Sequence, residues 1–196
     1  MKKTPCSILL TLSLLMTGCL TIPEATASDL EIRAMTFNVR NGRANDGENR
    51  WALRKDFVCD VIRDDAPDIL GLQEAYRFQF DDINERLAGY GEIGIGRDGG
   101  SKGEHSSILY KQNRFDVADS GTFWLSDTPA KPSAHWGNSY KRICTWARFS
   151  GYTAGAKIDY IFVTPKTHVS EASILRTHRD GRYPSDHYPV RATLHF

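Results

Sequence analysis

An early stretch of the chain constrains the fold most, because it carries a strand pattern, a helical pattern and a second strand pattern in succession. Apolar and polar residues alternate over residues 30–37, the period of a β-strand, and both faces become apolar toward its end. Residues 51, 54, 57, 58, 61 and 62 then fall at helical spacing, and all of these six except Arg54 are apolar; Pro67 ends that helix. The continuous apolar run 69–72 is typical of a buried strand. This order predicts a strand, a covering helix and a second, buried strand.

The rest of the chain carries more strand patterns than helical ones. A second, shorter helix is expected at 80–87, closed by Gly89 at its C-cap. Further strands are expected at residues 92–95, 106–110, 115–117, 122–125, 142–149, 157–163, 169–175 and 188–195. A chain of 196 residues, with 40% hydrophobic and 25% charged residues, is long enough to bury the core of one globular domain.

Residues 1–27 have the features of a secretory signal peptide. Two lysines precede an apolar run at residues 8–16, and the small residues Ala-Thr-Ala end at Ala27. The apolar run is too short to span a bilayer, so we expect no transmembrane segment. Cleavage after Ala27 would leave one exported domain, residues 28–196, in the periplasm or outside the cell.

The cysteines leave a second interpretation of the N-terminus open. Met-Thr-Gly-Cys at 16–19 resembles a bacterial lipoprotein box, which would place a lipid anchor on Cys19. Beyond the leader, Cys59 lies in a predicted helix and Cys144 in a predicted strand, and we expect both to be free thiols.

The charge balance favours no polyanionic partner. Removal of the leader takes away Lys2, Lys3 and Glu24, so Lys plus Arg falls from 25 to 23 and Asp plus Glu from 24 to 23. The remaining chain is formally neutral, whereas nonspecific nucleic-acid binders usually carry a basic excess. The six histidines show no His-x-x-His spacing and the cysteines no Cys-x-x-Cys pair, so no zinc site is expected.

Polar side chains that suit metal or phosphate chemistry stand at the ends of three predicted strands. Asn38 follows the first strand and Glu74 follows the buried one. Asp186 and His187 stand directly before the last strand. A carboxylate is a hard ligand for Mg²⁺ or Mn²⁺, and histidine titrates near neutral pH. Each position also has a simpler interpretation, as a turn residue or a solvated side chain.

Five short stretches lie at predicted strand ends and share one order with a known family. They are Thr-Phe-Asn-Val-Arg at 36–40, Leu-Gln-Glu at 72–74, Gly-Glu-His-Ser-Ser-Ile-Leu-Tyr at 103–110, Lys-Ile-Asp-Tyr-Ile-Phe at 157–162 and Ser-Asp-His-Tyr-Pro-Val at 185–190. Together they resemble the endonuclease/exonuclease/phosphatase superfamily, which includes DNase I-like nucleases. The resemblance covers roughly residues 30–149 and 151–196. It implies an α/β fold, a four-layer α-β-β-α sandwich of two mostly antiparallel sheets.

For function, the resemblance implies a Mg²⁺- or Mn²⁺-dependent phosphoesterase that hydrolyses a phosphodiester or phosphomonoester with metal-activated water. Glu74 and Asp186, together with Asn38, would hold one or two ions against a phosphate oxygen. The substrate classes compatible with the family are nucleic acid, a phospholipid headgroup and a sugar phosphate. The protein is expected to be a monomer.

The same resemblance assigns the remaining site residues. His187 would orient or deprotonate the attacking water, or grip the scissile phosphate, with Asn38 beside it. Asp159 lies in an apolar strand, where an unpaired carboxylate is costly, and the matching family residue holds this imidazole. Glu104 and His105 border the substrate cleft in the family, although a single histidine is more often a surface residue.

Between its two matching blocks the chain departs from the family pattern. Phe149 continues through residues 150–156 directly into Lys157, and neither the Asn-Thr-His-Leu-Asp-like motif nor the Gly-Asp-Phe-Asn-like motif occurs. A family His, Asp and Asn are therefore absent, and we expect a domain shortened near 149–151 with central strands missing. The alternative function is a catalytically inactive phosphate-binding module, or a truncated product of such a gene.

Overall fold

The computed structural model of the chain describes residues 31–150 and 167–196. The leader at 1–27, the strand expected at 157–163 and Asp159 within that strand lie outside these residues. What the sequence predicts for them stays a prediction.

Eight strands, two α-helices and one short 3-10 helix form within the described residues. The strands are β1 (Glu31–Asn38), β2 (Ile69–Ala75), β3 (Tyr90–Ile93), β4 (His105–Lys111), β5 (Asp116–Trp124), β6 (Ile143–Ser150), β7 (His168–Ile174) and β8 (Val190–His195). The helices are η1 (Gly47–Asn49), α1 (Trp51–Asp65) and α2 (Arg77–Arg86). Every helix and strand predicted for this part of the chain is present, with ends shifted by a few residues.

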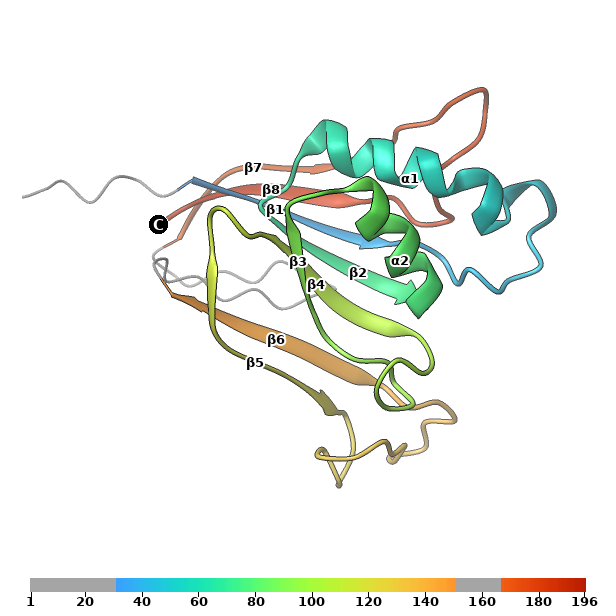
Figure 1. The fold of residues 1–196 in the computed structure, drawn as a ribbon, viewed down its shortest axis with the longest axis vertical. Coiled ribbons are helices and arrows are strands. Elements are labelled where there is room, and N and C mark those ends of the chain that lie inside the picture. Colours follow the sequence, from blue (N-terminus) through green and yellow to red (C-terminus); the bar gives the residue numbers. More distant parts are fainter. Residues whose placement is uncertain (1–30, 151–166) are drawn as a thin grey trace, which may run out of the picture.

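Two sheets organise the fold (Figure 1). The larger has the order β3-β4-β2-β1-β8-β7, in which β1 and β2 are parallel and the other pairs antiparallel. The smaller is the antiparallel pair β5-β6. Both helices cover one face of the larger sheet, and the smaller sheet lies on its other side. The α/β class with two mostly antiparallel sheets is confirmed, and the described layers run helices, large sheet, small sheet.

Strand β2 is buried on both faces, and β1 becomes so toward its end, as their apolar sequences predict. One face packs against the helices, where Phe37, Leu72 and Phe80 are fully buried. The other face packs toward the smaller sheet, in a cluster that includes Ile32 and Phe149. Removing these side chains from water stabilises the fold by about 25 cal/mol per Å² of apolar surface.

One strand differs from the prediction. The pieces expected at 115–117 and 122–125 form a single strand, β5, which pairs with β6 along its whole length. The polar residues between the two pieces interrupt the apolar pattern, but a register shift between Val117 and Asp119 keeps them in the ladder. A bulge of this kind leaves no periodic signal in the sequence.

The two cysteines beyond the leader lie within the described residues. Cys59 is a buried free thiol, and Cys144 is half-buried. No helix in the described part of the chain is long and apolar enough to cross a membrane.

The strand directions bring the polar strand ends to one edge of the large sheet. β1 and β2 run parallel, with Asn38 opposite Gln73, so both strands end at the same edge. β8 runs antiparallel to β1, with Val190 opposite Thr36, so it begins there. The end of β1, Glu74 and the turn before β8 therefore share this edge, which we call the site edge.

Asp68, just before β2, is a buried carboxylate that attracts several donors. It is 1% exposed, accepts hydrogen bonds from the backbone N–H of Arg33 (2.9 Å) and from Lys111 Nζ (3.0 Å), and forms an ion pair with Arg114. Burial alone would raise the pKa of this carboxyl, but the Arg33 amide and the two cations outweigh it and lower the pKa. The charged form of Asp68 therefore stabilises the folded state.

Replacing Asp68 with Asn should lower the free energy of unfolding at neutral pH by about 2 kcal/mol, because two cations lose their buried anion. In the wild type, the folded-state pKa lies below the unfolded value of about 3.9, so this stabilisation is complete above that value and is lost as the pH falls through the folded pKa. Urea denaturation across this pH range measures both effects. Asp56→Asn, which removes an exposed partner of Arg86, is the control and should change little. Equal stability of Asp68→Asn and wild type would contradict this role.

Candidate functional site

The turn that follows β1 holds the carboxylate of Glu74. The side-chain amide of Asn38 donates to Glu74 Oε1 (2.9 Å), and the backbone N–H of Asn41 donates to Oε2 (3.0 Å). Asn38 Oδ1 in turn accepts the N–H of Arg40 (2.9 Å), which closes the turn. Amide groups therefore fix both carboxylate oxygens, and no Lys or Arg in the described residues forms an ion pair with Glu74.

Two non-glycine residues at the site edge have left-handed backbone conformations. Glu74 has a φ of 61° and Arg40 a φ of 60°. The ladder between β2 and β4 shifts register between Gln73 and Ala75, and this bulge releases Glu74 from the regular pairing. A left-handed residue with a Cβ costs about 1–2 kcal/mol, and such strain is concentrated at functional sites.

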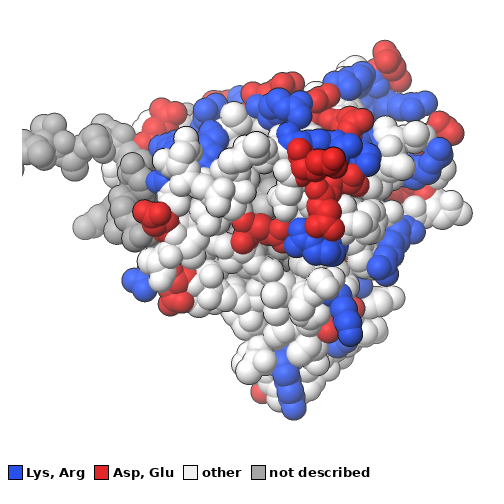
Figure 2. All heavy atoms as spheres, in the orientation of Figure 1, with Lys and Arg blue, Asp and Glu red and all other residues white. Residues whose placement is uncertain are grey.

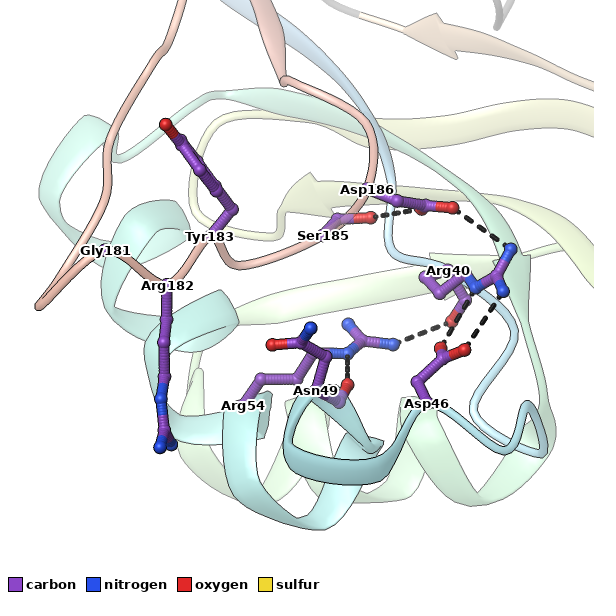
Figure 3. A pocket seen from close by; sticks show the side chains of 9 residues that line it. All are labelled: Arg40, Asp46, Asn49, Arg54, Gly181, Arg182, Tyr183, Ser185 and Asp186. Atoms are coloured by element: carbon purple, nitrogen blue, oxygen red, sulfur yellow. Dashed lines mark hydrogen bonds and ion pairs between the residues drawn. The ribbon is translucent and has the colours of Figure 1, made fainter.

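The guanidinium of Arg40 connects this turn to Asp186 (Figure 3). Its Nη1 lies 3.0 Å from Asp186 Oδ2, while Nε and Nη2 each lie 3.1 Å from a carboxylate oxygen of Asp46. The hydrogen bond to Asp46, followed by the charge of Asp186, raises the pKa of Arg40, and the same hydrogen bond lowers the pKa of Asp46. Arg40 is thus a permanent cation that holds Asp186 beside the end of β1.

A buried guanidinium, that of Arg54 on α1, ties three segments to the site edge. Its Nε donates to the carbonyl of Asn49 (2.9 Å) and its Nη2 to that of Arg40 (3.1 Å). Its Nη1 donates to the carbonyls of Val39 (2.7 Å) and Pro184 (3.0 Å). The residue is only 5% exposed, and burial lowers the pKa of Arg54. Four carbonyls replace the water that the charge loses on burial.

Three cavities open around Arg40 and Glu74. The Asp186 cavity, about 320 Å³, is drawn in Figure 3, and Arg40 and Arg54 are in its wall. The second and third cavities, about 440 and 240 Å³, both have Glu74 in their walls. Arg40 lines both the Asp186 cavity and the second cavity, so these two cavities share one wall residue.

Comparison with known proteins agrees with this geometry. Residues 35–133, about half of the chain, match the Endonuclease/Exonuclease/phosphatase family. The chain belongs to this family. The matched residues include Asn38 and Glu74 and end before Asp186 and His187.

Solved structures of family members from Bacteroides have similar folds. A protein from Bacteroides vulgatus is 25% identical, with a TM-score of 0.79, and covers 85% of this chain and 99% of that chain. The mannosyl-6-phosphatase of Bacteroides thetaiotaomicron is 25% identical, with a TM-score of 0.76, and covers 84% of this chain and 100% of that chain. An uncharacterized protein of Acanthamoeba polyphaga mimivirus is 29% identical over 119 residues, which are 52% of this chain and 17% of that protein.

Glu104 lies beside the turn that follows β1. It accepts hydrogen bonds from Asn41 Nδ2 (2.9 Å) and from Arg97 Nη1 (2.6 Å), and it lines the second and third cavities with Glu74. Because Asn41 also donates to Glu74, this one residue links the two glutamates. Whether Glu104 contacts substrate stays a prediction.

His105 is buried, so the expectation that it is a surface histidine is wrong. The residue is 2% exposed and packs against Phe80, with ring centroids 5.3 Å apart. Burial, and next the charge of the nearby Arg77, lowers the pKa of His105. The imidazole is therefore a neutral side chain in the floor of the third cavity.

His187 is exposed beside Asp186. Its Nε2 lies 3.9 Å from Asp186 Oδ1, which is too long for a hydrogen bond, and its backbone N–H donates to Ser185 Oγ (3.3 Å). The backbone is thus fixed while the ring faces solvent. Asp159, its partner by resemblance, lies outside the described residues, so that contact stays a prediction.

The donor set of the site edge fits a hard divalent ion. Within residues 31–150 and 167–196, no three or more His, Cys, Asp and Glu side chains gather as a metal site. Mg²⁺, however, takes one or two protein carboxylates and completes its shell with water. Within the described residues Glu74 forms no ion pair with a Lys or Arg, and Asn38, whose amide NH2 donates to Glu74, also carries an amide oxygen.

Of three further residues that build the site edge, one carries a signal in the sequence and two do not. Arg54 had one, because it is the single charged residue in an apolar helical pattern, and it is indeed buried. Arg40 and Asn41 lie in a turn rich in Gly, Asn and Asp, where no periodicity distinguishes one side chain from the next.

Replacing Arg54 with Lys should lower the free energy of unfolding by about 2 kcal/mol, because an ammonium cannot reproduce the planar fork that reaches four carbonyls. Hydrogen exchange should also become faster at residues 181–186, since one of the lost contacts holds that turn. Arg63→Lys, an exposed position on the same helix, is the matched control and should alter neither stability nor exchange. Unchanged exchange at 181–186 in Arg54→Lys would contradict the role of Arg54.

Proposed function

We propose that this chain is a divalent-metal-dependent phosphoesterase that uses water to hydrolyse a phosphomonoester or a phosphodiester. The carboxylate of Glu74 carries the proposal, because it is fixed by Asn38 and Asn41 and yet forms no ion pair with a Lys or Arg of the described residues. It lines cavities that also hold arginines, and phosphoryl transfer needs both a metal ligand and positive charge. Membership of the family supports the same reaction class.

Glu74, Asn38 and Asp186 are the residues that we propose to hold the ion. A bound Mg²⁺ or Mn²⁺ supplies positive charge against the phosphoryl oxygens. The amide of Asn38 keeps Glu74 Oε1 in one orientation, and Arg40, 3.0 Å from Asp186, does the same for that carboxylate. The protein thus orients both acids before substrate binds.

His187 is the residue that we propose to accept the proton of the attacking water. Its imidazole is exposed at the site edge and is not hydrogen-bonded to Asp186, from which it is separated by 3.9 Å. Proton transfer to a positioned histidine contributes about 10²- to 10⁴-fold in rate. Asp159 is the proposed carboxylate that would fix the orientation of this ring.

A sugar phosphate is the substrate class that we place first. The mannosyl-6-phosphatase of Bacteroides thetaiotaomicron has this fold and 25% identity. Tyr76 and Tyr140 line the second cavity together with hydrogen-bonding side chains, a combination suited to a sugar ring. Figure 2 shows acidic and basic side chains intermingled on the face in view, whereas a nucleic-acid site favours a continuous basic area. Nucleic acid and phospholipid headgroups are the classes to compare with it.

A catalytically inactive phosphate-binding module is the alternative. The sequence lacks the two family motifs that would add a His, an Asp and an Asn to the site. Loss of one preorganised electrostatic group commonly costs about 10²- to 10³-fold in rate. Such a module would bind phosphate in the second and third cavities without turnover.

The chain without residues 1–27 should hydrolyse p-nitrophenyl phosphate or bis(p-nitrophenyl) phosphate with Mg²⁺, and EDTA should abolish the reaction. Glu74→Gln should lower kcat/KM at least about 100-fold, because an amide is a poor ligand for a hard dication. His187→Ala should lower kcat about 10²- to 10⁴-fold.

Glu85→Gln, an exposed position on α2, is the matched control for Glu74→Gln and should leave the kinetics unchanged. Metal-independent turnover, or full activity of Glu74→Gln, would contradict the proposed enzyme. Phosphate binding without turnover of any ester would select the inactive module.

We also propose that the chain is exported with residues 1–27 removed. The support is the order of basic, apolar and small residues in that segment. Intact-mass measurement of the periplasmic product of bacterial expression should give a chain that begins at Ser28. A mass that corresponds to a chain lipidated at Cys19 would contradict cleavage after Ala27 and show a lipid-anchored protein. An unprocessed cytoplasmic chain would contradict export.

A further inference from the structure

Four basic side chains line the second and third cavities. Three of them are neutralised by acids, in the pairs Arg40–Asp46, Arg97–Glu104 and Lys141–Asp98, with nitrogen-to-oxygen distances of 3.1, 2.6 and 2.6 Å. The fourth is Arg142, whose guanidinium has no acidic or hydrogen-bonding partner among residues 31–149 and 167–196.

Arg142 lies just before β6, on the smaller sheet, and faces the site edge across the cleft. Its carbonyl accepts the N–H of Leu125 (2.8 Å), which fixes the backbone where β5 ends. Its side chain lines both cavities, and the third cavity also has Asn38 and Glu74 in its wall. Arg142, a cation with a fixed base, therefore shares a cavity of about 240 Å³ with Glu74, and neither forms an ion pair within the described residues.

We propose that Arg142 binds the phosphoryl group of the substrate, an inference that rests on the proposed function. A guanidinium presents parallel N–H groups to two phosphate oxygens, and hydrogen bonds of this charged type are about twice as strong as neutral ones. The sequence lacks the family His that would contact these oxygens. Arg142 supplies positive charge to them from the smaller sheet.

The neighbouring cations are less available than Arg142. Arg97 is ion-paired with Glu104 and lies over the ring of Tyr140, 5.5 Å from its centroid. Lys141 is ion-paired as well. A phosphate would have to displace an existing carboxylate to recruit either of them, whereas it gains the whole interaction with Arg142.

Titration with inorganic phosphate tests this inference without turnover. In calorimetry of the chain without residues 1–27, with Mg²⁺ present, the Kd for phosphate should rise at least about tenfold in Arg142→Ala and in Arg142→Gln. Arg148→Ala is the matched control, because Arg148 is an exposed arginine on β6 outside the walls of both cavities. Its Kd should stay within about twofold of the wild-type value.

An unchanged Kd in a folded Arg142 variant, or no phosphate binding by the wild type, would overturn the inference. Thermal denaturation shows which variants are folded, and either the Ala or the Gln variant suffices. Because the titration needs no hydrolysis, phosphate binding through Arg142 without turnover would refute the proposed enzyme and leave this inference standing. Mg²⁺-dependent turnover with the same KM and phosphate affinity in Arg142→Ala would refute this inference alone.

Discussion

The buried guanidinium of Arg54 is the interaction on which the arrangement of the site depends. A charge in the interior is tolerated only where acceptors replace its hydration, and here the acceptors are carbonyls from the residues directly after β1, from η1 and from the turn before β8. Satisfying this one charge fixes the paths of three segments that are distant in sequence. The turn that presents Asp186 is thereby packed beside the turn that holds Glu74.

Strand direction supplies the rest of the arrangement. Parallel β1 and β2 end at the site edge, and antiparallel β8 begins there, so polar side chains from the ends of three strands lie along this edge. The smaller sheet provides the opposite wall, where Arg142 stands. Glu74 on one sheet and Arg142 on the other, neither of which forms an ion pair within the part of the chain that the structure describes, thus line one cavity, and a phosphate ester with its metal would complement both.

The sequence predicts the elements and the strand-end residues well, because apolar periodicity stops at Asn38 and at Glu74. Tertiary contacts decide what it does not predict. The burial of His105 depends on Phe80, which lies on another element, and a lone histidine has no periodic signal. Arg54 is the one charged residue in the apolar pattern of α1, which indicates that it is buried. The four carbonyls that accept its hydrogen bonds lie in other segments of the chain, so the sequence pattern does not predict them.

Binding of Mn²⁺, followed by electron paramagnetic resonance of the free ion, tests most directly whether the site edge is a metal centre. The account predicts that the chain without its leader removes Mn²⁺ from solution, that Glu74→Gln abolishes this binding and that Asp186→Asn weakens it, while Glu85→Gln binds as the wild type does. Equal Mn²⁺ binding by wild type and Glu74→Gln would contradict it.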